Sequence, residues 1–215
     1  MNDSPAIVSV NVGAPRTVTW AGRAVTSAIW KDPVEHRVAV HGVNLAGDDQ
    51  ADRRVHGGPD KAVYSYSVED YAWWSAEMGN EIRFATFGEN LTTTGIDLNA
   101  CVIGTRWQVG TATLEVAQPR QPCFKLGMRM GDAQFVDRFD EAGRPGAYLR
   151  IVGDGEIGAG DAITVGPSPA HSLTIADLNT AQRNAPRALL DRIASTVDVP
   201  DGWRDWARRQ LARRD

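Results

Sequence analysis

Residues 105–125 read TRWQVGTATLEVAQPRQPCFK, and this stretch decides the fold. Apolar and polar residues alternate over residues 105–109 and again over residues 112–117, which is the period of a half-buried strand. The dipeptide Gly110-Thr111 between the two runs predicts a tight turn. We therefore expect a β-hairpin whose second strand delivers the chain to Cys123.

The loop after this hairpin is expected to hold a thiol still. Pro119 and Pro122 restrict their own backbone and that of the residues before them, so the loop should be stiff and extended. Arg120 and Lys125 flank Cys123 with positive charge, which favours the thiolate that attacks electrophiles or binds metals. On these local grounds, a buried and inert cysteine is as good an interpretation as a functional one.

The same alternation continues through most of the chain. About ten short strands at close spacing, with little helix between them, predict a mainly β protein built as a closed or nearly closed barrel. The last two strands are expected to pair with each other. Besides the hairpin, the predicted strands are residues 6–12, 16–20, 24–30, 37–40, 43–45, 62–66, 91–94, 148–152 and 162–165.

A few short helices interrupt the strands. Residues 68–78 form the clearest one, because Ser67 can cap its start and Gly79 can end it. Residues 133–141 form a second, shorter helix.

The pattern changes after Pro167-Ser168-Pro169, where the apolar period becomes about 3.6 residues. Three helices are predicted there, over residues 175–180, over residues 184–194 and from residue 200 onward. We expect a barrel domain over residues 1–167 and a three-helix domain over residues 168–215. Helices this short must pack on the barrel or on a partner, and the sequence leaves open whether they mediate a homodimer.

Composition excludes several classes of protein. The net charge of −4 argues against binding of a nucleic-acid polymer, so an anionic ligand would need a local basic cluster. No run of residues is apolar for long enough to span a membrane, and no signal peptide is recognisable, so we expect a cytoplasmic protein. With Cys101 and Cys123 as its only cysteines, the chain is not expected to depend on a disulfide.

A polar loop over residues 47–61 is a second candidate for function. It is long for a loop between strands, and the pair Gly57-Gly58 would let backbone amides approach a ligand. An anion-binding loop and a solvated loop with internal salt bridges both fit this composition. Its charged residues near the glycines are Arg53, Arg54, His56, Asp60 and Lys61.

Taken together, these stretches resemble the MOSC-domain family, in its small stand-alone bacterial form of the YiiM type, which carries three helices after the barrel. The resemblance runs in order over roughly residues 6–166 and continues in the tail. The stretches that carry it are IWKDPV (29–34), GDDQAD (47–52), VHGGPDKAVY (55–64), FGENL (87–91), QPRQPCFKL (118–126) and YLR (148–150).

The resemblance implies a barrel that binds the molybdenum cofactor and reduces N-hydroxylated compounds, such as 6-N-hydroxylaminopurine and related hydroxylamines, to amines. It implies that Cys123 is the protein ligand to molybdenum, with Asp60 and His56 as further catalytic residues. Phe124 stands where such proteins often have tryptophan, an apolar exchange that leaves ligation unaffected. The residues expected to hold the cofactor are Arg53, Arg54, His56, Gly57, Gly58, Lys61, Glu89, Asn90, Arg120 and Lys31.

Two other functions remain open at this point. Cys123 could carry a persulfide or hand on the cofactor in a relay, or the chain could be a structural binding domain. If the chain is a reductase, it needs a separate electron-donor protein, because it has no motif for flavin, haem or an iron–sulfur cluster.

Overall fold

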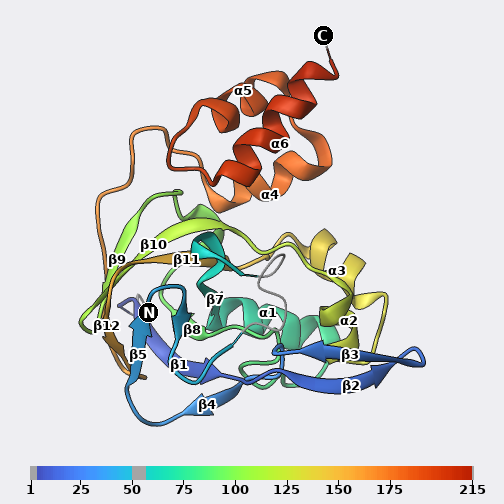
Figure 1. Cartoon of the computed structure of the whole chain (residues 1–215), viewed down its shortest axis with the longest axis vertical. Helices are drawn as coiled ribbons and strands as arrows, with labels where there is room; N and C mark the ends of the chain where they lie inside the picture. The colour runs from blue at the N-terminus through green and yellow to red at the C-terminus, as the bar shows by residue number, and fades with distance from the viewer. Residues whose placement is uncertain (1–3, 50–56, 215) are drawn as a thin grey trace.

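The computed structural model describes residues 4–49 and 57–214, and it is dominated by one curled sheet of eight strands (Figure 1). The strand order is β13-β9-β10-β11-β7-β8-β1-β4. All neighbours in this sheet are antiparallel except β7 and β8, which run parallel and are joined by a helical crossover. The strands are β1 (Ala6–Val12), β4 (Asp32–Val34), β7 (Val63–Ser67), β8 (Leu91–Thr94), β9 (Arg106–Val109), β10 (Ala112–Pro119), β11 (Ala147–Gly153) and β13 (Ile163–Val165).

Hydrogen bonds between the first strand and the segment that leads into β13 bring this sheet close to closure. The backbone N–H of Ile7 donates to the carbonyl of Asp161 at 2.9 Å, and the N–H of Ile163 donates to the carbonyl of Pro5 at 2.8 Å. Strand β1 therefore meets the segment that leads into β13, at the opposite side of the sheet. The prediction of a mainly β, nearly closed barrel is confirmed.

Two small sheets complete the strands. Arg16–Trp20 (β2) and Arg23–Ser27 (β3) form a hairpin, with Ala21 and Gly22 in the turn at positive φ. Strand β3 ends at Ser27, three residues before its predicted end. The other sheet has the order β12-β5-β6, with bounds Gly155–Ile157, Val38–His41 and Asn44–Leu45.

One predicted pairing is wrong. Residues 148–152 and 162–165 do form strands, but β11 lies between β10 and β7, whereas β13 pairs with β9. Local alternation identifies a strand but carries no information about its neighbour, so proximity in sequence was a poor guide here.

Helix α1 (Val68–Met78) has the predicted bounds. The hydroxyl of Ser67 accepts a hydrogen bond from the N–H of Asp70 at 3.0 Å, and Gly79 ends the helix at φ +70°. Trp74 of this helix packs with Phe87 and with Phe135 and Phe139 of α3 (Phe135–Ala142), which is the second predicted helix. The remaining short elements before the tail are α2 (Phe124–Met130) and two 3-10 turns, η1 (Pro59–Lys61) and η2 (Leu98–Ala100).

The last three helices lie together over one end of the sheet (Figure 1). Thr174 and Asp177 form a reciprocal capping box at the start of the first of them. One apolar cluster runs without interruption from Leu114 of β10 to Leu178 and Trp203 of these helices. The prediction of three helices in the tail is confirmed, although the first runs to Asn184 instead of residue 180. Its status as a separate domain from residue 168 stays a prediction. The helices are α4 (Ile175–Asn184), α5 (Arg187–Ser195) and α6 (Asp201–Ala212).

A search of the helices in the described part of the chain found none that combines the length and apolar character needed to cross a membrane.

Candidate active site

A pocket with about 670 Å³ of empty space, part of it open to solvent, lies between the end of β10, the start of α2 and the loops around residues 27–31 and 48–49. Cys123 lines it. The other lining residues are Ser27, Ala28, Ile29, Lys31, Asp48, Asp49, Lys61, Tyr64, Gly88, Asn90, Arg120, Gln121, Lys125 and Tyr148.

Cys123 is positioned by the junction between a strand and a helix. Strand β10 ends at Pro119, and α2 begins at Phe124, so the non-helical loop between them is only four residues long. Cys123 is the residue just before the helix and is half-buried, so its thiol is accessible from the pocket without being fully exposed. Helix α2 was not predicted from the sequence.

Arg120 supplies a fixed positive charge near this thiol. Its side chain is only 7% exposed, it donates to the carbonyl of Phe87, and its guanidinium carbon lies 4.8 Å from the centre of the Tyr64 ring. Burial opposes the charge, but the neighbouring Tyr64, Tyr148 and Cys123 groups raise the pKa of Arg120. The guanidinium therefore stays charged in the pocket wall.

Lys31 lines the pocket and is held there by an ion pair that the sequence did not indicate. Its ammonium contacts Oδ1 of Asp48, and both side chains are buried. Oδ2 of Asp48 accepts from the amide of Asn90 at 2.8 Å, and Oδ1 also accepts from the N–H of Gly13 at 2.9 Å. Burial lowers the pKa of Lys31, and Asp48 opposes that shift. Asp48 thus fixes two of the predicted cofactor-binding residues, Lys31 and Asn90.

The pocket is locally basic although the chain carries a net charge of −4. The acidic lining residues are Asp48 and Asp49, and Asp48 is neutralised by Lys31. Burial lowers the pKa of Lys61, which lies at the rim. The basic lining residues are Lys31, Lys61, Arg120 and Lys125. With Lys31 paired to Asp48, the other three form the local basic cluster that an anionic ligand requires.

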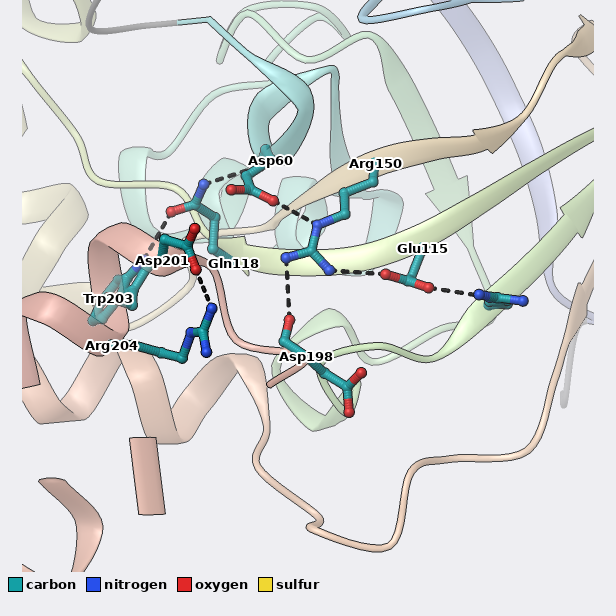
Figure 2. Close-up of polar contacts among 9 residues, drawn as sticks. Asp60, Glu115, Gln118, Arg150, Asp198, Asp201, Trp203 and Arg204 are labelled. Carbon is teal, nitrogen blue, oxygen red and sulfur yellow. Dashed lines mark hydrogen bonds and ion pairs between the residues drawn. The ribbon is translucent and has the colours of Figure 1, made fainter. Parts of the chain in front are cut away.

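Three predicted site residues lie beside this pocket instead of in it. Gly57, Gly58 and Asp60 line a second pocket, which shares Lys61 and Gln121 with the first. Asp60 is anchored there: its carboxylate accepts from Nε of Arg150 at 2.5 Å, and its carbonyl accepts from the amide of Gln118 at 2.9 Å (Figure 2).

Glu89 does not reach either pocket. Its side chain is fully buried, and Oε1 accepts from the hydroxyl of Tyr71 at 2.7 Å, the N–H of Ala85 at 2.7 Å and the hydroxyl of Thr92 at 3.0 Å. These bonds fix the turn before β8, which places the neighbouring Gly88 and Asn90 in the pocket wall.

Arg53, Arg54 and His56 lie outside the described residues. Their predicted contacts with a cofactor stay predictions.

Sequence reasoning missed the part that α6 plays. The indole N–H of Trp203 donates to Gln118 at 2.8 Å, and Arg150 contacts the carbonyl of Asp198 at 3.1 Å, just before that helix (Figure 2). The turn that carries Lys61 is therefore held from the C-terminal helices as well as from the sheet. The only available signal was the resemblance of the motifs around residues 118 and 150, because no local pattern links them to residue 203.

The donor set of the pocket suits a metal that arrives with ligands of its own. Among residues 4–49 and 57–214, no group of three or more histidine, cysteine or carboxylate side chains could hold a metal ion. The pocket instead offers one thiol among basic groups. A thiolate is a soft ligand, and the basic groups suit a phosphate on the same ligand.

Comparison with known proteins agrees with the sequence resemblance. The MOSC domain family matches residues 52–164. "Uncharacterized protein YflK" of Bacillus subtilis (strain 168) is 31% identical over 201 residues, which cover 93% of this chain and 91% of that protein. A protein of Gibberella moniliformis named "Reductase" is 33% identical over 184 residues, covering 83% of this chain but 32% of its own length.

A solved structure shares the whole architecture. The crystal structure of YiiM from Geobacillus stearothermophilus superposes with a TM-score of 0.80 at 30% identity, covering 96% of this chain and 99% of that one. The shared fold, the matched motifs and the extent of both sequence matches place the chain in the MOSC domain family.

Proposed function

We propose that this protein is an oxidoreductase that binds the molybdenum cofactor and reduces N-hydroxylated compounds to amines, with Cys123 as the protein ligand to molybdenum. The observation that carries the proposal is that the Cys123 thiol and four basic side chains line one pocket. Two facts from the comparisons support it: MOSC domains are associated with this cofactor in general, and one relative is named a reductase.

The residues present fit the cofactor. Cys123 would bind the metal, while Arg120, Lys31 and Lys125 would face the anionic part of the ligand. Asn90, held by Asp48, offers an amide for hydrogen bonds to a pterin ring. When bound, the cofactor would supply the change of oxidation state that removes oxygen from nitrogen.

The overall reaction fixes what the protein must deliver. Conversion of a hydroxylamine to an amine and water consumes two electrons and two protons. The electrons would come from a separate donor protein, because the cofactor is the only redox group proposed here.

Lys61 is the best-placed described residue for delivering a proton. It lines both pockets, and burial lowers the pKa of its ammonium, which makes it a stronger acid. Asp60, which the sequence suggested for catalysis, is anchored to Arg150 and fixes the turn that carries Lys61.

Metal analysis tests the proposal directly. Protein purified from a host that makes the cofactor should contain about one molybdenum per chain, lost in Cys123→Ser and retained in Cys101→Ser. Retention in both variants would remove Cys123 as the ligand. Sulfane sulfur on Cys123 without molybdenum would favour the sulfur-relay function instead. Reduction of a panel of hydroxylamines with an artificial electron donor, lost in Cys123→Ala, tests the activity.

A further inference from the structure

The second pocket has the lining of a ligand site in its own right. It has about 910 Å³ of empty space, part of it open to solvent, and lies between the turn around Gly58, the end of β10 and helix α6. Lys61 and Gln121 line both this pocket and the Cys123 pocket. A molecule held here would therefore adjoin the space around the thiol.

Two indole rings form the wall on the side of α6. Trp203 is 5% exposed and is fixed by its hydrogen bond to Gln118. Trp206 is half-buried, and its ring stands at 77° to that of Trp203 with the centres 5.7 Å apart. Both line the pocket, so they offer a rigid aromatic surface at little entropic cost. Such a surface favours a flat heterocyclic ring.

The polar groups of the pocket fit such a ring with an anionic substituent. Gln121 and Gln182 offer amides that can donate to and accept from ring atoms. Arg209 lies one helical turn after Trp206 and also lines the pocket. Arg204 and Arg208 of the same helix do not line the pocket and instead form ion pairs with Asp201 and Asp205.

The charge balance of the pocket favours an anion. Among the described residues that line it, the positive groups are Lys61 and Arg209, and the one carboxylate, Asp60, is engaged by Arg150. A guanidinium is well suited to phosphate because it can donate two parallel hydrogen bonds.

We propose that this second pocket binds the substrate as a nucleoside monophosphate, with the base against Trp206 and the phosphate at Arg209. The base then points toward Lys61 and Gln121, the two residues that line both pockets, with its exocyclic nitrogen on the side of Cys123. This inference rests on the proposed function and specifies the form of its substrate: a nucleotide instead of a free base.

Calorimetric titration of the full chain with adenosine 5′-monophosphate tests this, because the probe lacks the N-hydroxyl group and reports binding without turnover. We expect one site, with adenosine binding more weakly. Arg209→Ala should weaken binding of the nucleotide about tenfold and leave adenosine unaffected. Arg213→Ala removes the same charge from an exposed position past the end of α6 and should change neither. Trp206→Leu should weaken both ligands.

Several results would overturn the inference. Equal affinity for nucleotide and nucleoside would show that the pocket has no phosphate site. Equal losses of nucleotide affinity in Arg209→Ala and Arg213→Ala would show that Arg209 acts only through general charge attraction. Loss of nucleotide binding in Cys123→Ser would place the ligand in the first pocket. Recovery of a nucleotide covalently joined to the cofactor would make this pocket part of the cofactor site.

The proposed function and this inference fail separately. Absence of molybdenum or of reductase activity would remove the proposed function while leaving nucleotide binding measurable. If an active molybdoenzyme did not bind nucleotide, only the proposal of a nucleotide site in the second pocket would be wrong.

Discussion

The indole N–H of Trp203 donates a 2.8 Å hydrogen bond to Oε1 of Gln118, 85 residues earlier in the chain. The other end of the Gln118 amide donates to the carbonyl of Asp60. One buried side chain thus connects α6 to the turn at the rim of the Cys123 pocket.

Trp203→Phe removes the donor and keeps an aromatic ring. Because it leaves the buried oxygen of Gln118 without a partner, we expect a loss of roughly 1–3 kcal/mol in the free energy of unfolding. Trp206→Phe is the matched control, since Trp206 is only half-buried, and it should cost less. Urea unfolding of both variants measures the difference, and equal losses would show that the hydrogen bond contributes nothing.

The two cysteines should differ in reactivity. Burial raises the pKa of Cys101 to about 12, so very little of it is thiolate at pH 8. Cys123 is half-buried in a basic pocket that is open to solvent. Iodoacetamide at pH 8 should therefore modify Cys123 well before Cys101. Mass spectrometry of peptides from the wild type and from each serine variant identifies the modified site, and faster labelling of Cys101 would contradict this reading of the pocket.

Asp48→Asn should be strongly destabilising. It leaves the buried ammonium of Lys31 without its carboxylate, which typically costs about 3–5 kcal/mol. Asp154→Asn breaks the exposed contact with His41 and should cost less than about 1 kcal/mol. Combining Asp48→Asn with Lys31→Met should recover part of the loss in chemical denaturation. A small effect of Asp48→Asn would mean that the ion pair is solvated in solution.

Glu89 should make stability depend on pH. Burial raises its pKa above the ordinary value of 4.5, so the folded state holds this proton more tightly than the unfolded state. Its contribution is fully present below pH 4.5 and is lost as the pH rises through the higher folded value. Glu89→Gln, which cannot ionise, should therefore gain stability relative to the wild type between pH 4.5 and 7.5. Glu77→Gln on the exposed face of α1 should show no such trend in urea titrations.

Local signals predicted the elements that local contacts form. The cap at Ser67, the stop at Gly79 and the capping box at Thr174 all have their partners within four residues. Helix α2 was missed for a tertiary reason. Its Gly127 lowers the helical signal, yet a side chain there would come within 2.8 Å of the carbonyl of Asp132. Glycine is therefore required at position 127 by close packing and not by helix propensity.

The sequence indicated several of the residues that line the pocket, but not how they are held there, and their roles toward a cofactor stay predictions. Cys123, Lys61, Arg120, Lys31 and Asn90 do line one pocket, as the motifs suggested. Glu89 belongs to the same motif as Asn90 but points into the core, because neighbouring side chains at a turn face different ways. Likewise, no pattern revealed that Asp48 holds Lys31, since that contact depends on how two loops fold together.

The pairing of Ile7 with Asp161 also bears on how the protein is made. On the ribosome, the first strand emerges some 150 residues before the segment that completes its edge. Contacts so distant in sequence carry a large loop-closure cost and form slowly. Strand β1 can pair earlier with β4 and β8, but its edge at Ile7 stays unpaired until residue 161 has been synthesised. During that interval this edge is open to wrong partners.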